Sequence, residues 1–357
     1  MTHSTSTFPT MTIGLDVGDK KTHFCVLDSA RTVVARGSFP TTAAALRKAL
    51  APFAGARVIL EAGSQSPWMS RELQALGYAV HVADARRVQV IATDPRKSDR
   101  RDAEILARLG ATMPELLGNV HHRSAQAQGH LCIVRARDLL VRMRRMAVQQ
   151  VRGFCKAFGV RLPSSSTHAF SKKVADQIPN ELKLAVDPLL HQITEFSKLI
   201  DEYEDKLAEI AKQQYPETLR LRQVDSVGPL ISLSFILAVE DPRRFPKSRS
   251  VGAWLGLCSR SHASGDSAPQ LRISKAGDKF MRRLLVQGAA RMLGPFGKDS
   301  DLRRYGLKLI ARGGKGAKKR AVVAVARKLA VLMHRLWISN TDYEPLRSTN
   351  RAQTISA

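Results

Sequence analysis

Four carboxylates stand where short predicted elements end or begin, in the order strand, strand, helix. Asp16 follows one short apolar run and Glu61 ends another, while Asp99 and Asp102 lie three residues apart at a predicted helix start, hence on one helix face. Clustered carboxylates repel one another unless a cation lies between them. Two magnesium ions about 4 Å apart stabilise both the attacking and the leaving oxygen of a phosphoryl transfer. The pattern therefore predicts the divalent-metal site of a nuclease or transposase.

Each carboxylate also has an ordinary structural interpretation. Asp16 suits a turn and Glu61 a strand end, while Asp99 and Asp102 suit a helix start, where the helix dipole favours negative charge. Only the joint order of the four favours the metal site.

The chain up to about residue 110 alternates between strand and helix patterns. Runs with β character are predicted to form strands at 11–17, 22–28, 32–39, 57–62 and 78–84. Helices are predicted at 41–53, with a Thr cap, and at 66–77, closed by Gly77. This order favours an α/β RNase H-like fold, whose first and fourth strands and a later helix supply the carboxylates. A doubly wound nucleotide-binding fold is the alternative, but no GxGxxG or GxxxxGK[ST] motif follows a strand.

The charge of the chain indicates a polyanionic partner. Lys and Arg number 57 against 31 Asp and Glu, a formal net charge of +26 that is spread along much of the chain. Such a field favours nucleic acid, with binding that depends steeply on salt, and structural RNA would suit it as well as DNA. A membrane partner is disfavoured because no apolar run reaches the roughly 18 residues of a membrane span, and we expect no signal peptide before the first strand.

The cysteines give no sign of a metal or disulfide framework. Cys25, Cys132, Cys155 and Cys258 are far apart and form no CxxC pair. We expect free thiols in a reducing cytoplasm.

Two long helices are predicted in the middle of the chain. An Arg-rich stretch at 124–157 has apolar residues at helical spacing on one face and arginines elsewhere, so that one face packs while others meet phosphate. A second helix, beginning at Asp187-Pro188, has seven apolar seam positions spaced four and three apart: Leu189, Ile193, Phe196, Ile200, Tyr203, Leu207 and Ile210. This favours a coiled coil within or between chains; a two-helix hairpin packed on itself is the alternative.

The third segment begins with two apolar helices joined by a short Gly-containing loop. This pattern is typical of a helix-hairpin-helix, whose loop amides bind backbone phosphate. Ser226 stands where the usual loop has its first Gly, and a plain helix-turn-helix packing corner is the alternative.

A polar loop containing Ser264-Gly265 follows, rich in Ser, Gly and Asp. A serine attacks phosphorus only when a base or surrounding cations assist it, and Ser-Gly pairs are usually turns. A Gly-rich basic loop then leads into a last helix. The basic residues predicted to meet nucleic acid are Arg135, Arg142, Arg145, Arg272, Lys275, Arg282, Arg283, Lys315, Lys318 and Lys319.

The order of these motifs resembles the DEDD transposases of bacterial insertion sequences, the IS110 family, which are RNA-guided recombinases. The matching pieces include IGLDVGDKKTHFCVLD, VILEAGSQSPW, KSDRRDAEILARL, VDSVGPLISLSFILAVEDPRRF, SHASGDSAPQLRISKAGDKFMRRLL and KGAKKRAVVAVARKLAVLMHRLW. They span nearly the whole chain.

The resemblance implies a RuvC-like domain at 11–115, and the sequence of residues 1–10 before it is typical of a disordered leader. The resemblance further implies a helical coiled-coil region at 116–217, a mainly α C-terminal transposase domain at 218–340, and a tail, 341–357. Asp16, Glu61, Asp99 and Asp102 would hold Mg²⁺, for which Mn²⁺ can substitute, and Ser264 would be the nucleophile that forms a phosphoserine link to DNA.

The resemblance also implies the partners. They are donor and target DNA, a noncoding bridge RNA that selects the sites by base pairing, and further copies of the chain in a dimer or tetramer. The place of action would be the bacterial cytoplasm, at the nucleoid.

Two departures from the family pattern concern loops. Ser226 weakens the case for DNA contacts at the hairpin loop, and Asp266 and Ser267 replace a stretch that is often more Gly-rich and basic. Ser261 and Ser267 are therefore rival nucleophiles. The alternative activities are a junction-resolvase-like nuclease, which uses the same carboxylates with water as the attacking group, and a non-catalytic nucleic-acid-binding protein.

Overall fold

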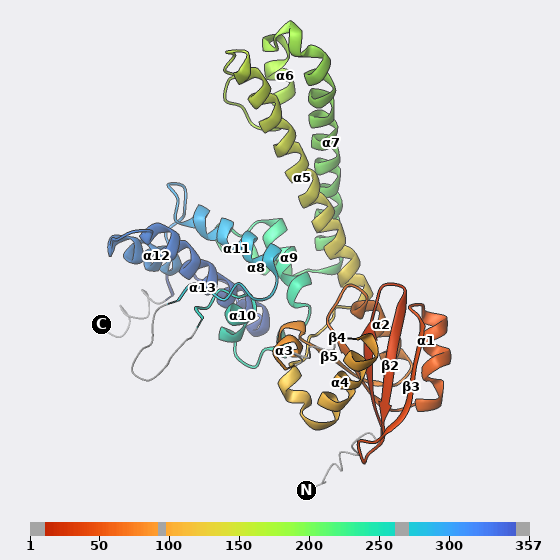
Figure 1. Ribbon diagram of the computed structural model, residues 1–357. Helices are drawn as coiled ribbons and strands as arrows, with labels where there is room; N and C mark the ends of the chain where they lie inside the picture. The colour runs from red at the N-terminus through yellow and green to blue at the C-terminus, as the bar shows by residue number, and fades with distance from the viewer. Residues whose placement is uncertain (1–10, 92–97, 261–270, 348–357) are drawn as a thin grey trace, which may run out of the picture. The chain divides into compact units, whose positions relative to one another are not determined.

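The computed structural model describes residues 11–91, 98–260 and 271–347, and the chain divides between Ala125 and Gln126 into two compact units (Figure 1). Among the described residues, no helix is both long enough and apolar enough to cross a membrane.

The first unit is built on a five-stranded mixed sheet of order β3-β2-β1-β4-β5. Strands β1, β2 and β3 pair antiparallel, whereas β4 pairs parallel with both β1 and β5. The strands are β1 (Thr12–Val17), β2 (Lys21–Leu27), β3 (Val33–Pro40), β4 (Arg57–Glu61) and β5 (Ala79–Ala83). The predicted mixed sheet is confirmed, and its architecture is consistent with an RNase H-like domain.

Helices cover both faces of this sheet. The helices of the unit are α1 (Ala43–Leu50), α2 (Ser66–Ala75), α3 (Ala85–Ile91) and α4 (Asp99–Thr112). Leu46 and Leu50 of α1 and Met69 of α2 share one core with Leu15 and Leu60 of the sheet. On the opposite face, Ala103 and Ala107 of α4 pack with Cys25 and Leu27, and Leu106 packs with Ile59.

A helical hairpin opens the second unit. Helix α5 (Ala125–Ala157) and helix α7 (Lys183–Gln214) run side by side, with α6 (Phe170–Val174) near the end where they are joined (Figure 1). Their pairing includes Arg137 with Glu204 and a 3.0 Å bond from Arg144 Nη1 to Ser197 Oγ. Of the predicted seam, Ile193, Ile200 and Leu207 are buried and the other four positions are partly buried.

The predicted start of α7 was wrong. The helix begins at Lys183, so Pro188 lies inside it instead of at its first position. A proline so close to a helix start removes a single i to i−4 hydrogen bond, to the Leu184 carbonyl, which the packing of Val186 and Leu190 into the hairpin core offsets.

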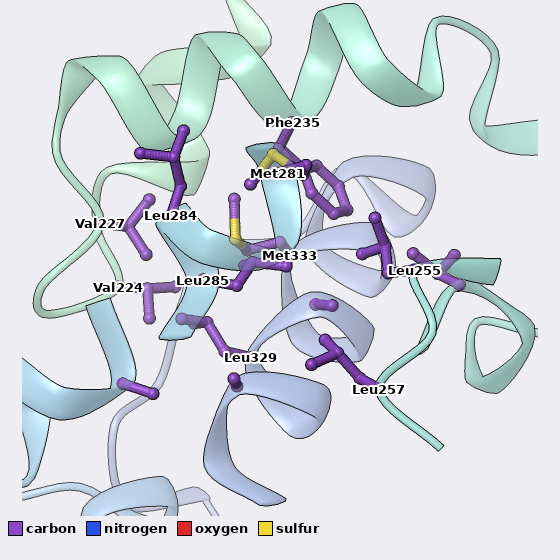
Figure 2. Close-up of a cluster of buried hydrophobic side chains, with 14 of the residues drawn as sticks. Val224, Val227, Phe235, Leu255, Leu257, Met281, Leu284, Leu285, Leu329 and Met333 are labelled. Atoms are coloured by element: carbon purple, nitrogen blue, oxygen red, sulfur yellow. The ribbon is translucent and has the colours of Figure 1, made fainter. Parts of the chain in front are cut away.

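The rest of the second unit is a mainly helical bundle. Its helices are α8 (Glu217–Leu221), α9 (Pro229–Val239), α10 (Arg249–Trp254), α11 (Lys279–Met292), α12 (Asp301–Ala311) and α13 (Ala317–Ser339). Figure 2 shows its core, where Phe235 of α9, Met281 and Leu285 of α11, and Leu329 and Met333 of α13 pack together. The predominantly helical C-terminal region is thus confirmed.

The loop between α8 and α9 contains a strained serine. Ser226 has φ 67°, a left-handed conformation that glycine adopts more readily. The substitution noted in the sequence therefore leaves the glycine-like backbone shape in place.

Candidate active site

Side-chain alternation along the strands directs the candidate residues to one face of the sheet. Leu15 and Leu60 belong to the core under α1 and α2, so the residues that follow them, Asp16 and Glu61, point to the opposite face, which α4 covers. His23 pairs with Asp16 across β1 and β2 and points to this same face.

The start of α4 brings two further carboxylates to this face. Ser98 caps the helix, its hydroxyl accepting a 3.4 Å hydrogen bond from the Arg101 amide, and Asp99 and Asp102 occupy the first turn. Gly14 allows α4 to approach the sheet closely, because a Cβ there would stand 2.1 Å from the carbonyl oxygen of Ala103. The predicted helix start is confirmed.

Three side chains converge where β1, β2 and α4 meet. Ligand atoms of Asp16, His23 and Asp99 all lie within 4.8 Å of one another. His23 Nδ1 lies 3.6 Å from Asp99 Oδ2, and it is a buried atom with no hydrogen-bond partner among the described residues. Two carboxylates and an imidazole nitrogen form a donor set that fits a divalent cation.

The other two predicted carboxylates lie near this group but outside it. Glu61 is exposed and ends β4, whose Leu60 pairs with Leu15, the residue before Asp16. Asp102 is partly buried, one turn of α4 beyond Asp99. The sequence prediction missed His23; counting pairs back through the β1–β2 hairpin would have placed it opposite Asp16.

A partly buried serine–histidine contact supports the loop after Glu61. Ser66 Oγ donates to the carbonyl oxygen of Gly63 at 2.8 Å and lies 2.8 Å from His122 Nε2. A hydroxyl has one hydrogen, so His122 Nε2 must be the donor to Ser66. Burial, together with the charges of Arg71, His121 and Arg123, lowers the pKa of His122 to about 4. His122 is therefore neutral at pH 7.

Ser264, with its rivals Ser261 and Ser267, lies outside the described residues, and the segments on either side of 261–270 pair with each other. Ser259 bridges to Ile273, and the Ser274 amide donates to the Cys258 carbonyl at 2.9 Å. Arg282 Nη1 donates to the carbonyl oxygens of Leu255 and Ala276, at 2.8 and 2.6 Å. Arg282, predicted to meet nucleic acid, thus links the two segments.

The other predicted nucleic-acid-binding residues fall into two groups. Three form ion pairs within the second unit: Arg283 with Asp138 at 2.6 Å, Arg142 with Asp138 at 3.4 Å, and Arg135 with Asp278 at 3.7 Å. Six have exposed side chains and no ion pair among the described residues, and these are Arg145, Arg272, Lys275, Lys315, Lys318 and Lys319. Lys318 and Lys319 lie in the first turn of α13.

Comparison with known proteins gives two family matches and several relatives that match over most of their length. The IS110-type DEDD model, described as Transposase, matches residues 13–158, and the model described as Transposase IS116/IS110/IS902 family matches residues 219–305.

Among the relatives is the transposase for insertion sequence element IS1111A of Coxiella burnetii, 26% identical over 94% of this chain and 91% of its own length. Another is a probable family 20 transposase of Pseudomonas aeruginosa, 28% identical over 81% of this chain and 86% of its own. The transposase for insertion sequence element IS1328 of Yersinia enterocolitica is 28% identical over 78% of this chain and 82% of its own length. With its two matched ranges and these relatives, the chain belongs to the DEDD transposases of the IS116/IS110/IS902 family, enzymes of DNA phosphoryl transfer.

Proposed function

We propose that this transposase cleaves and rejoins the DNA of an insertion sequence at a Mg²⁺ site formed by Asp16, Glu61, Asp99 and Asp102. The observation that carries this proposal is the convergence of Asp16 and Asp99 with His23 on the α4 face of the sheet. The family implies dependence on a divalent metal, and these donors fit one.

In this chemistry the protein would position the carboxylates that hold the cation. The carboxylates would hold the cation, which when bound supplies Lewis acidity at a phosphoryl oxygen and stabilises the leaving oxygen. Gly14 and the Ser98 cap keep the first turn of α4 against the sheet, so that Asp99 and Asp102 stay near Asp16. The neutral His122 holds Ser66, which anchors the turn that follows Glu61.

Ser264 is the proposed nucleophile. Its oxygen would attack a DNA phosphorus, its proton would pass to solvent or a nearby base, and the bond from phosphorus to the 3′ oxygen would break, giving a phosphoserine link and a free 3′ hydroxyl. A 3′ hydroxyl freed in the same way on another strand can then attack the phosphoserine phosphorus, which joins the two strands and releases the serine. The pairing of 256–260 with 271–275 and the Arg282 hydrogen bonds supply a rigid base for this segment.

The proposed partners are donor and target DNA, a bridge RNA and further copies of the chain, acting in the bacterial cytoplasm at the nucleoid. The net charge of +26 suits two polyanions held at once. The α5–α7 hairpin carries exposed apolar side chains, including Leu139, Met143, Met146 and Leu199, which suit a coiled-coil contact between copies.

The test is a denaturing gel of labelled donor and target DNA after incubation with Mg²⁺ and the purified protein, carrying the RNA that it retains from expression. We expect a protein-linked DNA band that disappears in Ser264→Ala and in Asp16→Ala. Ser267→Ala and Ser261→Ala should keep the band, and its loss in either one instead of Ser264→Ala would move the nucleophile. Cleavage without any linked band would favour the junction-resolvase-like nuclease, and unchanged DNA would favour a binding protein.

A further inference from the structure

The metal group contains a histidine that the four-carboxylate set does not include. We propose that His23 is itself a ligand of the catalytic divalent cation, through Nδ1, alongside Asp16 and Asp99. This inference deepens the proposed function and rests on its metal site.

The backbone of His23 is held rigidly beside Asp16. The two residues are partners in a β1–β2 register that runs from Thr12 with Leu27 to Val17 with Thr22. The turn between the strands is tied by a 3.0 Å hydrogen bond from Thr41 Oγ1 to the Gly18 carbonyl. Such preorganisation is what a metal ligand needs, because its position is set before the ion arrives.

The surroundings of His23 Nδ1 point to a cation. The side chain is only 15% exposed, and the 3.6 Å separation from Asp99 Oδ2 is too long for a hydrogen bond. Buried polar atoms are nearly always satisfied, so an orphaned imidazole nitrogen that faces carboxylates calls for a partner. Ligand atoms held about 2.1 Å from one cation stand roughly 3 to 4 Å apart, and the 3.6 Å from His23 Nδ1 to Asp99 Oδ2 lies in this range.

A nitrogen ligand changes which ion the site prefers. Oxygen-only sites suit Mg²⁺, whereas imidazole favours first-row transition metals. His23 should therefore give the site a preference for Mn²⁺ over Mg²⁺ that carboxylates alone would not give.

The test measures metal binding directly on the full-length protein. Mn²⁺ affinity is followed by electron paramagnetic resonance of free Mn²⁺, Mg²⁺ affinity by its competition with Mn²⁺, and ligand identity by pulsed detection of ¹⁴N coupling to bound Mn²⁺. We expect nitrogen coupling in the wild type and its loss in His23→Gln, with Mn²⁺ affinity about 10- to 100-fold weaker and Mg²⁺ affinity reduced less.

Two further variants sharpen the result. His81→Gln is the matched control, because His81 lies on β5 and its Nε2 is 2.8 Å from the Gly118 carbonyl oxygen; it should keep the nitrogen coupling. His23→Asp offers an oxygen in place of nitrogen, and it should bind Mn²⁺ without nitrogen coupling and with a smaller preference over Mg²⁺. Metal-free thermal unfolding checks that each variant folds.

Absence of the metal site and absence of the His23 ligand give different results. Should Asp16→Asn leave Mn²⁺ binding unchanged, or should the wild type bind none, the proposed metal site itself is overturned. Should Asp16→Asn abolish binding while the wild type shows no nitrogen coupling and folded His23→Gln keeps full affinity, only the role of His23 is overturned and the carboxylate site stands.

Discussion

Asp16 and His23 are directly opposite each other on the antiparallel strands β1 and β2, and both point to the face of the sheet that α4 covers. The hairpin register thus sets an imidazole beside the first carboxylate of the site, and α4 adds Asp99. These three candidate metal ligands come from three different elements, and Asp16 and Asp99 are 83 residues apart in sequence.

Replacing Asp16 should separate chemistry from binding. Asp16→Ala removes a ligand of the proposed cation, so we expect strand exchange to fall by at least about 100-fold, while DNA and RNA affinity stay within about twofold because the net charge becomes only more positive. Activity is measured by the yield of joined DNA and affinity by filter binding. Asp28→Ala, in the turn after β2 where Asp28 accepts from the Thr32 amide, is the control and should stay active. Equal activity of Asp16→Ala and Asp28→Ala would show that Asp16 is not part of the catalytic site.

Adding one methyl group at Gly14 should push α4 away from the sheet. The new Cβ would stand 2.1 Å from the Ala103 oxygen and 2.4 Å from the Ala107 nitrogen, both backbone atoms that have no rotamer to change. We expect Gly14→Ala to destabilise the first unit by about 3 kcal/mol and to weaken Mn²⁺ binding. Gly153→Ala is the opposite control, because nothing lies within 4 Å of its added Cβ and alanine favours the α5 helix. Denaturant unfolding measures the stability of both variants. An unchanged stability of Gly14→Ala would contradict the close approach of α4 to the sheet.

The partly buried His122 should make the fold sensitive to acid. Its pKa is lowered to about 4 in the folded chain from an ordinary 6.5, so between these values the unfolded chain binds a proton that the folded chain does not. Stability is therefore lost as the pH falls from about 6.5 towards 4. Since His122 is partly exposed, we expect about 1 kcal/mol after allowance for solvent screening.

Thermal unfolding across this pH range is the measurement. His122→Gln should show a smaller fall in melting temperature than the wild type, because the remaining histidines titrate in both. Parallel curves for the two proteins would show that His122 carries no such linkage.

Basic residues with and without an ion pair should contribute differently to the salt dependence of nucleic-acid binding. Removing Lys318 and Lys319 together should reduce the slope of log affinity against log salt by about 2, if both meet phosphate. Removing Arg135 and Arg142, which pair with Asp278 and Asp138, should change it less because these charges are already partly neutralised. The measurement is nucleic-acid affinity from low to moderate salt. Equal slopes for the two double variants would show that Arg135 and Arg142 also contact the nucleic acid.

Local patterns predicted the elements of the first unit well. Alternating apolar residues gave the positions of all five strands, Thr42 caps α1, and α4 begins at Asp99 as expected. Such signals are short-range, since strand alternation and capping depend on neighbouring residues. They failed at the start of α7, where the burial of Val186 and Leu190 extends the helix ahead of Pro188.

From the sequence alone we could predict a polyanionic partner and a carboxylate metal site, because net charge, residue type and spacing can be read without coordinates. Only the tertiary structure decided that His23 joins Asp16 and Asp99, that Arg282 links the segments beside 261–270, and that Arg283 is paired with Asp138. Each of these contacts depends on strand register or on the packing of helices distant in sequence. Those arrangements arise from the burial of whole faces, which no local pattern specifies.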